Sequence, residues 1–168
     1  GGMKMYEAST LDTLIQIARE KGILCIADEI MTGFGRTGKW FAMDYLAQKP
    51  DIVCFSKGLT GGMMAMGLTL CSEQLFQSFL SDDRRKMMFH SHSFTANPLA
   101  CAAANASLDL MEKEETWESI ARVETRHREF AGTLTDHPIL KNVRIHGTIL
   151  AMEVETGESN GYLHSIRD

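Results

Sequence analysis

The sequence predicts an α/β fold built around a mostly parallel sheet. Two short apolar runs, residues 23–27 and 52–56, have the length and composition of buried strands and are bounded by turn-forming residues. An amphipathic helix is predicted directly before the first run, and a helix leading into a strand is typical of doubly wound folds, where parallel pairing is the default. Ligands of such sheets bind at the carboxyl ends of the strands.

The elements of the first half follow from periodicity and turn signals. A helix is predicted over residues 10–21, because apolar residues recur at helical spacing and Gly22 follows as the glycine that ends the helix. Ser9 or Thr10 is its expected N-cap. After the two strands we expect a strand at 67–71, a helix at 72–80 with Ser72 as its cap, and a charged, solvated loop at 81–86.

The second half predicts two longer helices and a strand pair. The first helix is alanine-rich, spans residues 97–111 and carries Pro98 in its first turn, a favoured position for proline. The charged run at 113–115 is read as a hinge. We then expect an amphipathic helix at 117–134 and strands at 143–145 and 149–154 on either side of a turn at Gly147. The residues expected to face inward on the last helix are Ile120, Val123, Phe130 and Leu134.

A carboxylate and an amine follow the two predicted parallel strands. Asp28 comes directly after the first run and Lys57 directly after the second, so both are expected at the same edge of the sheet. A neutral lysine amine can form a Schiff base with an aldehyde, and a carboxylate can keep a pyridine nitrogen protonated. Pyridoxal phosphate requires these two groups. Taken alone, the pair is better explained as an ordinary ion pair at the strand ends.

The glycine spacing of residues 33–38, GFGRTG, matches the dinucleotide-binding fingerprint. In such a site the glycine loop leaves the strand directly and opens a helix, whose N-terminus binds the pyrophosphate. Here residues 28–32 intervene with two acidic side chains, and no long amphipathic helix begins at Gly38. A nicotinamide- or flavin-dependent oxidoreductase is therefore the weaker alternative. The glycines are instead expected to shape an irregular loop that carries Arg36 toward the pocket.

Composition argues against several kinds of ligand. A net charge of −5 gives no basic surface for nucleic acid, and no apolar run approaches the length of a membrane-spanning helix. His90 and His92 share a face of an extended segment, but no third ligand lies nearby, so no metal site is expected. The cysteines are expected to be small buried apolar residues in a reducing compartment: Cys25, Cys54, Cys71 and Cys101.

Three stretches resemble the class III (ω-amino) aminotransferases: IADEIMTGFGRTGKWFA, SKGLTGG and SFTANPLACAAANASL, in this order and spacing. The resemblance covers nearly the whole chain. It implies a pyridoxal-phosphate-dependent transferase of fold type I, with residues 1–113 in the cofactor-binding large domain and 114–168 at the start of the α+β C-terminal domain. It also implies a middle piece of a protein more than twice as long, with the phosphate-binding loop, the ring-stacking aromatic residue and the C-terminal substrate arginine of the family outside this chain.

The resemblance assigns roles to individual residues. Lys57 would carry the cofactor and transfer a proton, Asp28 would hold the pyridine nitrogen protonated, and Ile30 would pack on the ring face. Ser93 would contact the phosphate of the cofactor bound by the other subunit, which implies a homodimer with shared active sites. Arg36 matches a family position near the substrate carboxylate.

The resemblance also implies a reaction. KGLTGG and NPLACAAANASL are most similar to the family members that transfer an amino group from S-adenosylmethionine to 8-amino-7-oxononanoate, giving 7,8-diaminononanoate in biotin biosynthesis. The alternatives are another class III enzyme, acting on ornithine, 4-aminobutyrate or diamines, and an inactive fragment. A cytoplasmic location is expected. The isolated chain is expected to lack transaminase activity.

Overall fold

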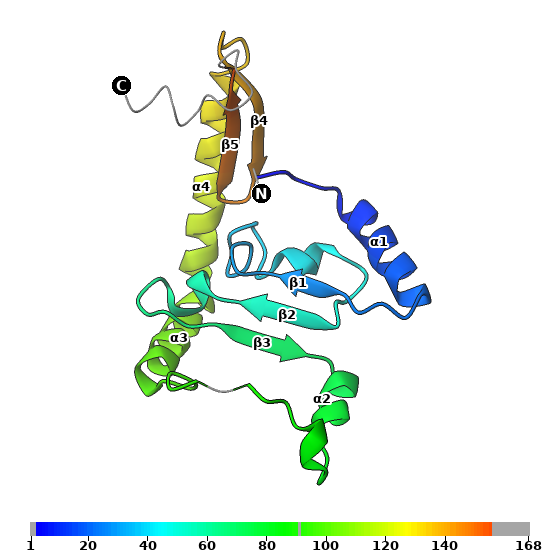
Figure 1. The fold of residues 1–168 in the computed structure, drawn as a ribbon. Helices are drawn as coiled ribbons and strands as arrows, with labels where there is room; N and C mark the ends of the chain where they lie inside the picture. The colour runs from blue at the N-terminus through cyan, green and yellow to red at the C-terminus, as the bar shows by residue number, and fades with distance from the viewer. Residues whose placement is uncertain (1–2, 91, 156–168) are drawn as a thin grey trace, which may run out of the picture.

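The computed structural model describes residues 3–90 and 92–155 of the chain (Figure 1). Its central sheet has the order β1-β2-β3, formed by β1 (Ile26–Asp28), β2 (Ile52–Phe55) and β3 (Leu68–Cys71). β1 and β2 pair in parallel, as predicted, with Asp28 opposite Cys54. β3 pairs with β2 in the antiparallel direction. The connection of about a dozen residues between them permits either direction, so the sequence pattern does not specify it. Residues 23–25, predicted to be strand, precede β1 without joining the ladder.

The first helix, α1 (Ala8–Glu20), ends as predicted at Gly22. Gly22 adopts a φ of +68°, its N–H donates to Arg19 O at 3.0 Å, and the next N–H, that of Ile23, donates to Ala18 O at 2.9 Å. These two bonds close the last turn of the helix before the chain enters the sheet. The N-cap prediction was wrong: the cap is Glu7, because the helix starts early enough to place Ser9 and Thr10 inside its first turn.

The alanine-rich helix α3 (Pro98–Met111) covers the segment that follows β2. Ala100 and Ala104 of this helix are buried, and their small side chains allow it to approach η2 (Lys57–Thr60) closely. At its start, the Asn97 carboxamide oxygen accepts from the N–H groups of Leu99 at 2.9 Å and Ala100 at 3.4 Å. The residue that caps α3 is therefore Asn97.

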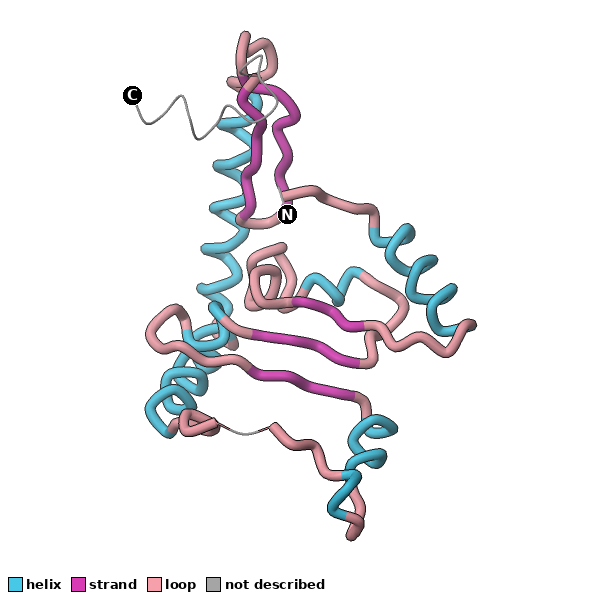
Figure 2. The backbone as a smooth tube through the Cα atoms, in the orientation of Figure 1, coloured by secondary structure: helices cyan, strands magenta, loops and turns pink. Residues whose placement is uncertain are grey.

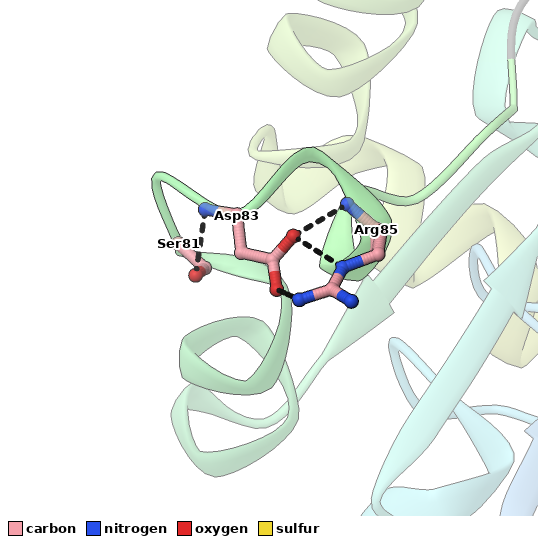
Figure 3. A network of polar contacts seen from close by, with 3 residues as sticks. All are labelled: Ser81, Asp83 and Arg85. Carbon is pink, nitrogen blue, oxygen red and sulfur yellow. Dashed lines mark hydrogen bonds and ion pairs between the residues drawn. The ribbon is translucent and has the colours of Figure 1, made fainter.

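The short helix α2 (Glu73–Phe79) leads into a charged turn (Figure 3). Ser72 is its N-cap residue, although its hydroxyl makes no capping bond. The segment predicted to be a loop contains a 3-10 turn, η3 (Arg84–Lys86), because Asp83 accepts from the backbone N–H of Arg85 at 3.1 Å and from its guanidinium at 2.9 and 3.0 Å. These bonds lower the pKa of the Asp83 carboxyl and raise the pKa of Arg85.

The last elements form an arm that stands beside the sheet (Figure 2). It comprises α4 (Glu114–Gly132) and a hairpin of β4 (Leu140–His146) and β5 (Ile149–Val154), which turns at Gly147 as predicted. Two of the residues expected to face inward do not: Val123 is 39% and Phe130 50% exposed, because the hairpin packs on α4 along one side only.

The cysteines differ from the expectation that they would be buried. Three are only half-buried, and Cys71, at the end of the edge strand β3, is exposed. All four carry free thiols. In the described ranges no helix is both long and apolar enough to span a bilayer.

Candidate active site

The candidate site lies at the carboxyl ends of β1 and β2. Asp28 is the last residue of β1 and Lys57 opens the 3-10 turn just after β2. Because the two strands are parallel and in register, both residues lie at the same edge of the sheet, as predicted. Both side chains are exposed. No ion pair joins them in the part of the chain that the structure describes, so the strand-end ion pair considered from the sequence is not formed.

The backbone around Lys57 is held in an uncommon conformation. Lys57 has a φ of +45°, in the left-handed region that costs a side-chain-bearing residue of order 1 kcal/mol. The following Gly58 packs under the ring of Phe34, and a Cβ at Gly58 would lie 2.9 Å from Phe34 Cβ. Ser107 on α3 donates to Gly58 O at 3.1 Å, and Ser56 donates to Met66 O at 2.6 Å. Packing and hydrogen bonds therefore fix the turn that presents the lysine.

A second carboxylate, Glu29, faces the opposite way from Asp28. Its side chain is buried, 2% exposed, and accepts from the N–H groups of Ala42 at 3.1 Å and Met43 at 2.7 Å and from the Thr32 hydroxyl. Those two N–H groups begin η1 (Ala42–Tyr45), so Glu29 ties the end of β1 to this turn. Sequence reasoning treated Glu29 only as a negative charge near the glycine loop. The available signal was strand alternation, which places neighbouring side chains on opposite faces.

The glycines of residues 33–38 serve close packing. A Cβ at Gly33 would lie 3.0 Å from Glu29 O, and one at Gly35 would lie 2.5 Å from Ile120 Cδ1 on α4. Gly35 and Gly38 also have positive φ values of +81° and +89°. No α-helix begins at this loop, which runs through turns into η1. The loop therefore lacks the helix N-terminus that binds a dinucleotide pyrophosphate. This contradicts the oxidoreductase alternative, which required such a helix.

The glycine loop is joined to the turn of the β4–β5 hairpin. Arg36 O accepts from Thr148 N at 3.0 Å and from Thr148 Oγ1 at 3.2 Å, and Arg36 Nη1 donates to Thr148 Oγ1 at 3.3 Å. Gly147 lies so close that a Cβ there would come within 2.3 Å of Thr37 C and 2.4 Å of Gly38 N. We call this contact, between residues 36–38 and 147–148, the loop–hairpin clasp. Sequence reasoning missed it, because the partners are separated by more than a hundred residues.

The remaining predicted site residues are distributed unevenly. Ile30 lies beside Asp28, donates its N–H to Asp28 Oδ1 at 3.0 Å, and is half-buried. Ser93 is exposed in the turn before α3, and no described hydrogen bond connects it with Asp28, Ile30 or Lys57. The fold thus assembles the carboxylate, the amine and the apolar side chain at one edge, and leaves Ser93 outside that group.

The donor set at this edge fits pyridoxal phosphate. Asp28 keeps one carboxylate oxygen without a hydrogen bond, and the Lys57 amine has no described partner, so an acceptor and a primary amine are both available to one ligand. No cluster of three metal-binding side chains occurs among the residues that the structure describes. Two cavities, of about 560 and 490 Å³, are lined by other residues, and the Asp28–Lys57 edge is an open surface of this chain.

Comparisons with known proteins identify the family of the chain. The family model described as aminotransferase class-III matches residues 1–168. A Synechococcus elongatus protein named adenosylmethionine-8-amino-7-oxononanoate aminotransferase is 40% identical over 99% of this chain and 38% of its own length, and its Helicobacter pylori namesake is 36% identical over 92% and 36%. The crystal structure of the Methanocaldococcus jannaschii namesake matches with a TM-score of 0.84 and 34% identity, covering 91% of this chain and 36% of that one. The chain therefore spans little more than a third of the relatives it matches.

Proposed function

The chain belongs to the class III aminotransferases, and from this premise we propose that the protein containing it transfers an amino group from S-adenosylmethionine to 8-amino-7-oxononanoate with pyridoxal phosphate as cofactor. The product would be 7,8-diaminononanoate, an intermediate of biotin biosynthesis. The observation that carries the proposal is the placement of Asp28 and Lys57 on one sheet edge without an ion pair between them.

The chain's own residues would divide the work as follows. Pyridoxal phosphate, when bound, supplies an aldehyde that reacts with amines and a pyridine ring that withdraws electrons from the substrate. The Asp28 carboxylate would hold a proton on the ring nitrogen, and Ile30 would pack against the ring. The Lys57 amine would hold the cofactor and then take a proton from the substrate α-carbon and return it as a general acid. The Arg36 guanidinium would bind the substrate carboxylate.

Sequence identity supports this substrate pair over ornithine. The relatives named for the reaction on 8-amino-7-oxononanoate are 34–40% identical to the chain. By contrast, the Toxoplasma gondii ornithine aminotransferase structure matches at 27% identity, with a TM-score of 0.80. An aminotransferase acting on ornithine, 4-aminobutyrate or a diamine is therefore the second candidate.

The organisation of the whole protein is part of the same proposal. We assign residues 1–113 to the large domain and 114–168 to the start of the C-terminal domain, since α4 begins at Glu114; residues 156–168 lie outside the described range. Ser93, set apart from the Asp28–Lys57 edge, would donate to the cofactor phosphate of a second subunit, so the enzyme would be a homodimer. Its small-molecule substrates and free cysteine thiols support a cytoplasmic location.

Borohydride labelling of the full-length protein tests the cofactor assignment. Reduction in the presence of pyridoxal phosphate, followed by digestion and mass spectrometry, is expected to find a pyridoxyl group on Lys57. The full-length Lys57→Arg variant is the matched control, because it keeps the charge and is expected to lose the label and the activity. A cofactor-saturated, folded protein with unmodified Lys57 would contradict the assignment. Turnover with ornithine or 4-aminobutyrate, and none with S-adenosylmethionine, would favour the second candidate.

A further inference from the structure

We propose that Thr148, at the turn of the β4–β5 hairpin, is a positioning residue that orients the Arg36 guanidinium toward the carboxylate of the substrate. The inference rests on the proposed function, because that proposal assigns the substrate contact to Arg36. Thr148 itself lies in the hairpin turn, apart from every residue assigned above, and contacts Arg36 through the loop–hairpin clasp.

The Thr148 hydroxyl both donates to Arg36 and accepts from it. Its oxygen lies 3.2 Å from Arg36 O, to which it donates, and 3.3 Å from Arg36 Nη1, from which it accepts. A hydroxyl has one proton and two lone pairs, so these two bonds fix both its orientation and the position of the guanidinium relative to its own backbone. No other hydrogen bond of this guanidinium occurs among the described residues, so its remaining N–H groups stay available for a carboxylate.

The backbone that carries Thr148 cannot shift relative to the glycine loop. The Thr148 N–H donates to Arg36 O at 3.0 Å, and Gly147, with a φ of +56°, contacts the peptide between Thr37 and Gly38 with no room for a side chain. Tyr45 holds the loop from another side, donating its hydroxyl to Thr37 O at 2.8 Å. Burial, and then the charge of Glu124, raise the pKa of the Tyr45 phenol, so it remains a hydrogen-bond donor at neutral pH.

The charges around the clasp leave Arg36 free to bind an anion. Glu124 on α4 extends toward Gly38, but its carboxylate pairs with Arg128 one helical turn further along. No described ion pair involves Arg36. The Arg36 guanidinium is held by a hydrogen bond at Nη1 and has no ion-pair partner among the described residues. Because its rotamer is already fixed, it loses less conformational entropy when it binds a carboxylate, which strengthens binding without a new contact.

Steady-state kinetics of the full-length enzyme test the proposal with a matched pair of variants. Thr148→Val keeps the shape and removes the hydroxyl, whereas Thr148→Ser keeps the hydroxyl. We expect Thr148→Val to raise KM for 8-amino-7-oxononanoate roughly 3- to 10-fold with little change in kcat, because the hydrogen bond that holds Arg36 Nη1 is lost. Thr148→Ser is expected to keep KM for 8-amino-7-oxononanoate near the wild-type value. The carboxamide analogue of the acceptor should show no such shift, and Thr148→Val should add nothing in an Arg36→Ala background.

Two kinetic outcomes would overturn the role of Thr148. One is an equal change in KM for the acid and its carboxamide, and the other is a Thr148→Val effect that persists without Arg36. Crystal structures of the full-length wild type and Thr148→Val proteins provide a readout that needs no turnover: Arg36 is expected in one conformer in the first and in several in the second. A single unchanged conformer refutes the inference even if the enzyme is active. Loss of the proposed function is recognised separately, by a wild-type protein in which Lys57 is not labelled.

Discussion

At the scale of single residues, the chain separates two adjacent carboxylates by burial. Asp28 is exposed at the sheet edge and keeps an oxygen free, whereas Glu29 is buried and accepts three hydrogen bonds, one from the Thr32 hydroxyl and two from N–H groups of η1. Asp28 is therefore available to a ligand, whereas Glu29 binds the backbone near the end of the same strand. Their roles follow from the pleat of a strand, which sends successive side chains to opposite faces.

Replacement of Glu29 by glutamine is expected to destabilise the full-length protein by about 2 kcal/mol. An amide keeps one oxygen acceptor, so its NH2 group would face the N–H group of either Ala42 or Met43, and the bond that remains to the other would be neutral and not charge-assisted. Urea unfolding at neutral pH measures the change. Glu112→Gln, at an exposed position just after α3, is the matched control and should stay within about 0.5 kcal/mol of wild type. Equal midpoints for the two variants would show that the Glu29 contacts contribute nothing.

At the scale of elements, the parts that the sequence predicted are those whose causes are local. Helix α1 and its Gly22 ending, the parallel β1–β2 pair and the hairpin at Gly147 depend on spacing and turn residues a few positions apart. The placement of Asp28 and Lys57 followed from that pair. The exposure of Phe130 could not be predicted in this way, because it depends on which face of α4 the hairpin covers.

The loop–hairpin clasp was beyond sequence reasoning for the same reason. Its bonds join Arg36 to Thr148, and neither position shows a local signal for the other. A glycine at a hairpin turn is explained fully by its positive φ, so nothing in the pattern indicates that Gly147 also contacts a distant loop.

Gly147→Ala is expected to destabilise the full-length protein by roughly 2 kcal/mol or more, through both positive φ and a clash with Thr37 and Gly38. Gly132→Ala is the matched control, because that glycine ends α4 with nothing within 4 Å of the added methyl group. It should be neutral or slightly stabilising. Thermal unfolding followed by circular dichroism compares the two. If Gly147→Ala and Gly132→Ala unfold at the same temperature, the loop–hairpin clasp does not exist in solution.

At the scale of the whole molecule, the chain leaves much of its sheet uncovered. Apolar residues of β1 and β3 are exposed: Ile26 is 63%, Leu68 38% and Leu70 51% accessible. The strand register places Ile26 on the opposite face of the sheet from Leu68 and Leu70, so apolar side chains are exposed on both faces and each face requires a cover. The relatives are nearly three times as long as the part this chain matches, which gives ample sequence to supply one.

The isolated 168-residue chain is therefore expected to self-associate and to show no transaminase activity. Size-exclusion chromatography with light scattering, together with a turnover assay in the presence of pyridoxal phosphate, measures both properties. The full-length protein under the same conditions is the control for refolding and cofactor loading. A monodisperse monomer, or detectable turnover by the isolated chain, would contradict the expectation.

The loop–hairpin clasp also has a consequence for the order in which the protein is made. Its two sides are 112 positions apart in the sequence, and a ribosome adds residues from the N-terminus onward. At typical rates of synthesis, roughly 10 s separate the appearance of Arg36 from that of Thr148. For most of that interval the strands that precede Asp28 and Lys57 have been made, but the hairpin that holds the arginine loop has not. We expect the cofactor side of the site to become ordered first and the substrate side last, when the hairpin arrives.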